Sequence, residues 1–312
     1  MADSPAAVVL RDATLREGRD VPCVSFAPDE RVAIATALAA AGVPEAEVVA
    51  PSRVAEDVGI ARTMHEIPIQ LTGLVYANRA SWREDLELAV PALSRVDLLM
   101  PLSERREPHD PERKIEAVER ALREACGASA STAIGAGFPH AFQVRQASVL
   151  DAVARAAAAG ADRITLYDTN GAADPSTVEE LVGRAVSAAG VPVFFHGHDD
   201  LGLATANAWA AVRAGAGGLD VTVNGLGDRA GNVSLEQLVV LLRLRGRDTG
   251  VDPAALPGLS QMVAELSGVE VPPLAPVVGR FAFAHRSPAH LPQPGEFEAF
   301  DPALIGTESR QA

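Results

Sequence analysis

Residues 191–232 have the sequence VPVFFHGHDDLGLATANAWAAVRAGAGGLDVTVNGLGDRAGN, in which two strand-like runs flank a helix-like run. The first strand-like run, 191–195, leads directly into His196 and His198. Residues two apart on a strand point to the same side, so both imidazoles are expected to face one site. This pattern predicts a metal site at a strand end. The other interpretation is an ordinary pair of strand histidines followed by turn glycines.

The same alternation of short apolar runs and alanine-rich helical patterns extends along the chain. The expected strands are 8–10, 46–49, 67–75, 96–100, 132–136, 163–166, 191–195 and 219–223. Helix start and stop signals such as Asp174-Pro175 and Gly190 delimit several of the intervening segments, expected at 29–41, 150–159, 177–189 and 203–214. Eight strands alternating with helices favour a (β/α)₈ TIM barrel, an α/β fold, over a doubly wound open sheet.

The pattern changes after residue 251. We therefore expect residues 1–251 to form a catalytic barrel and residues 252–312 to form a short C-terminal appendage. This appendage would hold one helix, 256–268, and a proline-rich segment that contacts a partner subunit.

Composition excludes several classes of function. The formal net charge of −14 argues against nucleic-acid and membrane partners, because both require a basic surface. The two cysteines, Cys23 and Cys126, have no disulfide-type or zinc-type spacing. The sequence shows no signal peptide and no apolar run long enough to cross a membrane. These features predict a cytoplasmic protein.

The first expected strand leads into a cluster of charged residues, Arg11-Asp12-Ala-Thr-Leu-Arg16-Glu17-Gly. In a (β/α)₈ barrel the active groups gather at the C-terminal ends of the strands, so Glu17 would lie at the same mouth as His196 and His198. Two histidines and a carboxylate leave open positions on a divalent ion. The other interpretation is a set of salt bridges among these charged residues alone.

Five segments resemble the isopropylmalate synthase and homocitrate synthase group of the DRE-TIM metallolyase superfamily. They are TLREG (14–18), LYDTNGAADP (166–175), HGHDDLGLATANAWAAVRAGA (196–216), VTVNGLGDRAGN (221–232) and FAFAHRSPAHLPQPGEFEAFDP (281–302). The resemblance extends from about Leu10 to Gly306 and implies the (β/α)₈ fold.

The resemblance also assigns roles to individual residues. It implies a divalent metal (Mg, Mn, Zn or Co) whose ligands are Glu17, His196, His198 and, nearby, Asn232. Arg16 would be the electrostatic catalyst, and His290 would assist proton transfer in the barrel of a partner subunit. The acceptor substrate would contact Thr169, and we expect Asp20, His140 and Asn224 to line the same pocket.

Three departures from the group concern the site. Arg19-Asp20 stands where the group has Glu-Gln, and Pro139-His140 stands where it has a Glu-Asp-Ala-x-Arg segment. The Pro139 turn resembles 3-hydroxy-3-methylglutaryl-CoA lyases. Phe297 replaces the tyrosine of a Tyr-Glu-x-x-Pro segment and so lacks a hydroxyl.

The implied activity is a Claisen-type condensation of an acyl-CoA, expected to be acetyl-CoA, with a 2-oxo acid, followed by thioester hydrolysis. The implied assembly is a homodimer. Two alternatives remain open: a carbon–carbon lyase or aldolase of the same superfamily, and a non-catalytic paralogue that acts as a binding module. An iron oxygenase would also use two histidines and a carboxylate, but the barrel pattern argues against it.

Overall fold

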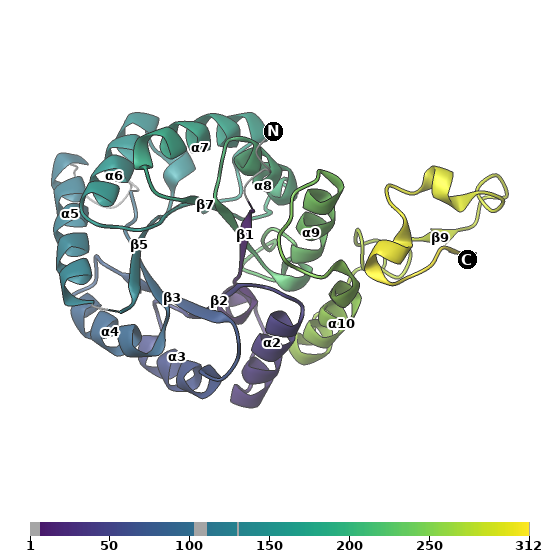
Figure 1. Cartoon of the computed structure of the whole chain (residues 1–312), viewed down its shortest axis with the longest axis horizontal. Coiled ribbons are helices and arrows are strands. Elements are labelled where there is room, and N and C mark those ends of the chain that lie inside the picture. The colour runs from purple at the N-terminus through teal and green to yellow at the C-terminus, as the bar shows by residue number, and fades with distance from the viewer. Residues whose placement is uncertain (1–6, 103–110, 130, 312) are drawn as a thin grey trace, which may run out of the picture.

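The computed structural model describes residues 7–102, 111–129 and 131–311. Within these ranges eight parallel strands close into a barrel in sequence order, β1 through β8 (Figure 1). They are β1 Val9–Asp12, β2 Glu45–Val49, β3 Gln70–Tyr76, β4 Arg95–Leu99, β5 Ala133–Phe138, β6 Ile164–Asp168, β7 Val193–Gly197 and β8 Gly218–Val221. The predicted (β/α)₈ fold is confirmed, and the open sheet is excluded because β1 pairs with β8.

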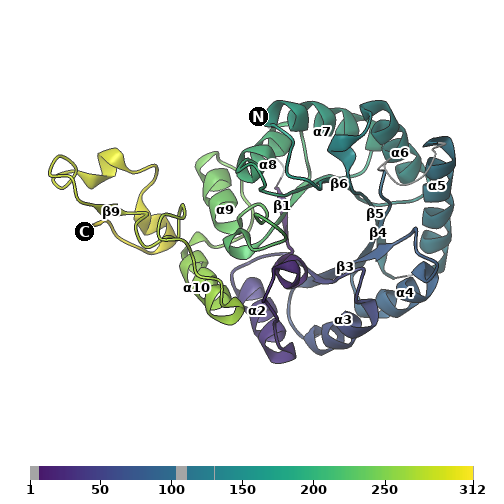
Figure 2. The same ribbon diagram turned by 180° about the vertical axis from the view of Figure 1, so that it is seen from behind.

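A ring of helices surrounds the barrel, as both face-on views show (Figures 1 and 2). The helices are α1 Thr14–Glu17, α2 Pro28–Ala40, α3 Val54–Ala61, α4 Trp82–Ala89, α5 Pro111–Ala128, α6 Gln146–Ala158, α7 Pro175–Ala189, α8 Ala204–Arg213, α9 Leu235–Leu244 and α10 Leu256–Ser267. Asp174 caps α7 by accepting hydrogen bonds from the backbone N–H groups of Ser176 and Thr177, as predicted, and Gly190 ends that helix at φ 65°.

The barrel interior contains charged layers rather than a purely apolar core. Near the amino ends of the strands, Arg163 donates two hydrogen bonds of 2.6 and 2.7 Å to Glu45 and stacks over Phe194. One layer higher, Arg11 is fully buried and lies 2.6 Å from Asp97 and 2.8 Å from Asp220. The Arg163–Glu45 and Arg11–Asp97 pairs cross the barrel interior, whereas Arg11 and Asp220 lie on the neighbouring strands β1 and β8.

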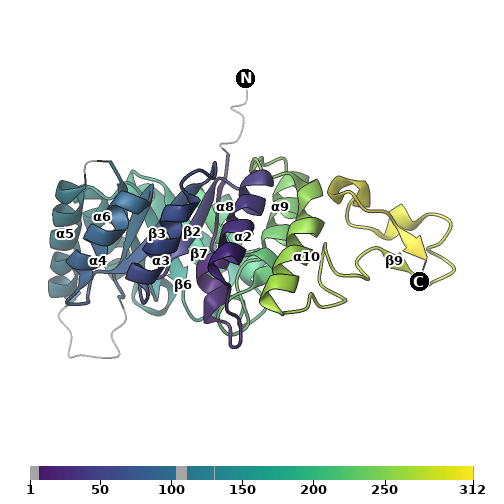
Figure 3. The same ribbon diagram turned by 90° about the horizontal axis from the view of Figure 1, so that it is seen from below.

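The C-terminal region separates into two parts. Helix α10 packs against α2 beside the barrel wall. The segment after α10 projects outward (Figure 3), and it contains a two-stranded sheet of β9 Ala284–His285 and β10 Arg310–Gln311. Ile305 is buried and anchors the end of this segment. The segment therefore presents most of its surface away from its own barrel.

Two further observations concern the whole chain. Both cysteines are free, as their spacing predicted. Among the helices of the described ranges, none combines the length and the apolar character needed to cross a membrane.

Candidate metal and active site

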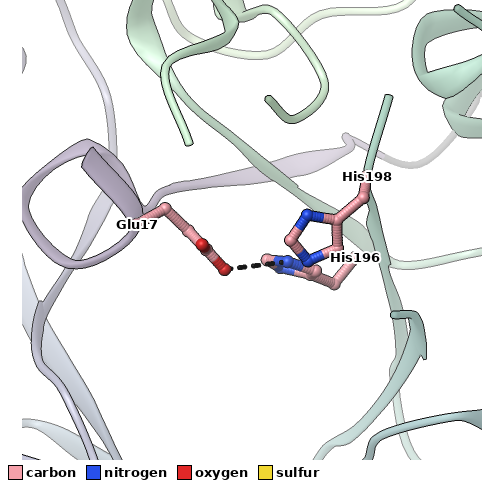
Figure 4. A group of neighbouring side chains, drawn as sticks. All are labelled: Glu17, His196 and His198. Atoms are coloured by element: carbon pink, nitrogen blue, oxygen red, sulfur yellow. Dashed lines mark ion pairs between the residues drawn. The ribbon is translucent and has the colours of Figure 1, made fainter. Parts of the chain in front are cut away.

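The barrel fold brings Glu17, His196 and His198 together at one point (Figure 4). Glu17 ends α1 directly after β1, His196 lies in β7, and His198 is the first residue after Gly197, where β7 ends. One possible ligand atom from each residue lies within 4.8 Å of the others, and all three residues are buried. The predicted convergence of these side chains is confirmed.

A hydrogen bond to Asp220 determines which ring nitrogen of His196 carries the proton. Its Nδ1 atom lies 2.9 Å from the Asp220 carboxylate, which only accepts, so Nδ1 carries the proton. Nε2 then accepts a 3.2 Å hydrogen bond from the Asn232 amide and also lies 3.2 Å from Glu17 Oε1, a second acceptor. Two acceptors at this distance require a cation or a second proton between them. Burial alone would lower the pKa of His196, but hydrogen bonds to Asp220 and Glu17 raise it.

His198 and Asn232 present further unused ligand atoms. Nδ1 of His198 and Oδ1 of Asn232 are buried and have no hydrogen-bond partner. Burial and the neighbouring His196 lower the pKa of His198 to about 3, so its ring is neutral and has a free lone pair. Unpaired buried polar atoms are costly, and a bound ion would satisfy them. The donor set fits a divalent metal.

Arg16 lies beside the three ligands. Its Nε donates a 2.6 Å hydrogen bond to Glu47, its Nη1 pairs with Glu17, and its Nη2 has no partner. Burial would lower the pKa of Arg16, but Glu17 and Glu47 raise it well above the usual range. Burial would likewise raise the pKa of Glu17, but Arg16 and His196 hold it well below the usual range. Both groups therefore stay charged.

The interior ion pairs that connect to this site contain more negative than positive charge. The guanidinium groups of Arg11 and Arg16 pair with a larger set of carboxylates: Glu17, Glu47, Asp97 and Asp220. With His196 neutral, as it would be with a metal on its Nε2, the network would have two uncompensated negative charges, and burial makes uncompensated charge unfavourable. A divalent cation would balance it. Glu47, Asp97 and Asp220 were not predicted as site residues.

Thr169 and His140 are brought together at the ends of β6 and β5. The Thr169 hydroxyl accepts a 2.8 Å hydrogen bond from the backbone N–H of His140. His140 has φ 64°, a left-handed conformation that is uncommon for a residue with a side chain. The Asp20 side chain pairs with Arg53 and is partly exposed; partial desolvation and the charge of Glu17 raise its pKa.

Arg19 and Asn224 have structural partners. The Arg19 guanidinium turns toward α3, where it donates a 2.8 Å hydrogen bond to Glu56.

Asn224 Nδ2 donates to the Ser260 backbone carbonyl at 2.9 Å, and the Ser260 hydroxyl donates to Asn224 Oδ1. Both ends of this amide are bonded to Ser260 of α10, so the Asn224 side chain anchors that helix, and its expected substrate contact stays a prediction.

His290 lies in the projecting C-terminal segment, which extends away from its own barrel (Figure 3). Its ring stacks on Phe297 with 3.8 Å between centroids, and its Nδ1 lies 3.4 Å from that of His285. His285 in turn lies 2.9 Å from Glu298. The structure thus groups these residues with one another and not with Glu17.

The loop after β8 is held by Arg229. Its guanidinium donates 2.8 and 2.9 Å hydrogen bonds to the Asp200 carboxylate and a 2.8 Å hydrogen bond to the Thr169 carbonyl.

Asp168 accepts hydrogen bonds from the backbone N–H groups of Ala172 and Ala173, and Asp199 accepts one from Ala204 at the start of α8. These acidic residues fix the loops around the site.

Sequence comparison places the chain among known proteins. The family model described as HMGL-like matches residues 7–263. The chain is 34% identical to homocitrate synthase 1 from Nostoc sp., over 97% of this chain and 82% of the relative. It is 31% identical to 2-isopropylmalate synthase 2 from Caldanaerobacter subterraneus, over 98% of this chain and 81% of the relative. It is also 34% identical to 2-phosphonomethylmalate synthase from Streptomyces rubellomurinus, over 97% of this chain and 83% of the relative.

Structure comparison agrees on the fold. An HMG-CoA lyase from Acinetobacter baumannii, in complex with coenzyme A and 3-methylmalate, superposes with a TM-score of 0.73 at 21% identity, covering 87% of this chain and 94% of that one. An HMG-CoA lyase from Pseudomonas aeruginosa gives a TM-score of 0.72 at 19% identity, and the match covers 86% of this chain and 95% of that one. At these identities the likeness shows a shared barrel fold.

Proposed function

Because the chain belongs to the HMGL-like family, we propose that it is an acyltransferase that condenses acetyl-CoA with a 2-oxo acid in a metal-dependent, Claisen-type reaction. The observation that carries this proposal is the buried cluster of Glu17, His196 and His198 beside Arg16. The relatives that share 31–34% identity over nearly the whole chain are named as synthases. They favour condensation over the lyase alternative and over a non-catalytic role.

In this proposal Glu17, His196 and His198 hold a divalent metal, with Asn232 beside them. A divalent ion bound there would supply Lewis-acid polarisation of the 2-oxo acid carbonyl. The free Nη2 of Arg16 would stabilise the negative charge that develops on the ketone oxygen. Thr169, held in place by His140, would contact the substrate carboxylate.

The proposed reaction has three steps. The α-carbon of acetyl-CoA loses a proton and attacks the ketone carbon, which forms one carbon–carbon bond and leaves an alkoxide. The alkoxide takes up a proton to become a tertiary alcohol. Water then cleaves the thioester, giving a carboxylate and the free thiol of coenzyme A.

Incubation with acetyl-CoA, Mg²⁺ or Mn²⁺ and a panel of 2-oxo acids is expected to release free thiol with at least one acceptor. The panel should contain short-chain, branched, dicarboxylic and phosphonate-bearing members, since the named relatives make different products. Thiol release is followed colorimetrically and the product by mass spectrometry, with EDTA-treated protein as control. Cleavage of a 3-hydroxyacyl-CoA without any acceptor-dependent thiol release would instead establish a lyase.

We propose that His290 assists proton transfer in the barrel of a second copy, because it belongs to the segment after α10, which projects outward from its own barrel (Figure 3). His290→Ala and His198→Ala are each expected to be inactive alone. Co-expression of the two variants should restore about a quarter of the activity, since half of the dimers would be mixed and each would hold one intact site. Activity is measured by thiol release from the co-purified mixture.

Two results would contradict this role of His290. Full activity of His290→Ala would remove the residue from the mechanism. An inactive mixture of two separately folded variants would show that His290 does not act in a second copy. His65→Ala, which alters an exposed histidine, is the matched control for each preparation.

A further inference from the structure

Tyr167 is a buried residue of the barrel interior that belongs to the LYDTNGAADP segment but was not predicted as a site residue. It lies on β6 directly beside His196 of β7, with which it pairs in register. The two ring centroids are 4.6 Å apart, and the tyrosine is 5% exposed. Its hydroxyl is buried and has no hydrogen-bond partner. A phenol without a partner next to a metal ligand indicates a place where a ligand atom completes the site.

Gly137 on β5 determines where this ring lies. A Cβ atom at Gly137 would be 3.0 Å from Tyr167 Cε2 and 3.5 Å from its hydroxyl oxygen, and only 2.5 Å from Leu99 Cδ2. The ring therefore extends across β5 through space that any other residue would fill. Leu74 and Leu99 pack against it in a small apolar cluster that is separate from the main core. The ring is fixed by its neighbours, and only its O–H bond is free to rotate.

The hydroxyl lies in the same charged region as Arg16. Tyr167 stacks beside His196, the Nε2 atom of His196 lies 3.2 Å from Glu17, and Glu17 pairs with Arg16. Arg16 Nη2 is likewise buried without a partner. The interior thus holds two unpaired donors, one charged and one neutral, beside the cluster of metal ligands.

We propose that the Tyr167 hydroxyl donates a hydrogen bond to an oxygen of the carboxylate–carbonyl head group of the acceptor acid. Tyr167 would then be a catalytic residue that touches the substrate, and Gly137 would be a positioning residue that leaves room for its ring. The identity of the head group rests on the proposed function. The contact itself rests on the unpaired hydroxyl and its fixed position.

Tyr167→Phe keeps the ring and removes only the hydroxyl. With Mn²⁺ present and pyruvate as the probe, calorimetry is expected to show affinity reduced about tenfold or more, as for loss of one hydrogen bond to a charged acceptor. The kcat/KM for condensation should fall by a similar or larger factor, while Mn²⁺ affinity and the melting temperature stay unchanged. Tyr76→Phe removes the only other tyrosine hydroxyl, on a half-buried residue, and is expected to change neither affinity nor kcat/KM.

A second measurement does not depend on the stability of the variant. Pyruvate binding to the Tyr76→Phe protein should shift the ultraviolet absorption of its single remaining phenol, Tyr167. Absence of this shift, absence of pyruvate binding to the unmodified protein, or equal pyruvate affinity in Tyr167→Phe would overturn the contact. A protein that binds pyruvate through Tyr167 but releases no thiol with any acceptor would overturn the proposed condensation and leave the contact standing.

Discussion

Replacing His198 by alanine is expected to remove the bound divalent ion and to abolish turnover. Its neutral ring is buried beside His196 and Glu17 and its Nδ1 has no partner, so the substitution removes one of the three converging ligand atoms. Loss of a residue that merely orients a metal ligand typically costs about 10–100-fold in metal affinity, and loss of a ligand itself should cost more. Metal content by mass spectrometry and thiol release are the measurements.

The matched control for this experiment is His65→Ala, because His65 is an exposed histidine outside the cluster. It should retain both metal and activity. A His198→Ala protein that binds the ion with unchanged affinity and turns over normally would show that the metal site lies elsewhere.

Arg16→Ala is expected to lower kcat by about 10²–10³-fold, with a smaller effect on KM. The Arg16 guanidinium is held by Glu47 and Glu17 and its Nη2 amino group has no partner, so it is already in place when negative charge develops on the ketone oxygen. Fixed donors of this kind act mainly on the transition state. Steady-state kinetics of thiol release with the best acceptor separates the two parameters.

Arg19→Ala serves as the control for Arg16→Ala, because its guanidinium points toward Glu56 of α3 and not into the barrel. It should leave kcat nearly unchanged. If Arg16→Ala had a normal kcat and only a raised KM, Arg16 would bind the substrate in the ground state and would not be the electrostatic catalyst.

The fold was predictable from sequence because parallel strands buried on both faces appear as short apolar runs between helical patterns. All eight expected strands are present, although their ends differ. The run expected at 191–195 forms strand 193–197, and the run expected at 67–75 forms strand 70–76. Strand ends depend on hydrogen bonds to neighbouring strands, which a single segment of sequence does not specify.

The cluster of Glu17, His196 and His198 was predictable because its members lie at or just after the carboxyl ends of strands, whereas the network behind it was not. The salt bridges considered among Arg11, Asp12, Arg16 and Glu17 are correct for the Arg16–Glu17 pair only. Arg11 instead pairs with residues 86 and 209 positions away along the chain, Asp97 and Asp220. The available signal was a single acidic residue inside an otherwise apolar strand, as in VDLL and LDV.

Loop residues were harder to place than strand residues. Asn224 belongs to the loop that resembles the synthases, yet its φ of 59° and its bonds to Ser260 turn its amide toward α10. Neighbouring positions in a loop can point in opposite directions, so matching a motif fixes the backbone better than it fixes the side chain.

Asp220 serves two groups at once, since it accepts hydrogen bonds from His196 and from Arg11. Any substitution of Asp220 would disturb both His196 and the ion pairs that tie the strands together, so this position tolerates few replacements. Leu74, Leu99 and Gly137 on β3, β4 and β5 contribute no charge to that network. A change in the volume of these three residues would alter the space around Tyr167 and leave the charge balance of the network unchanged.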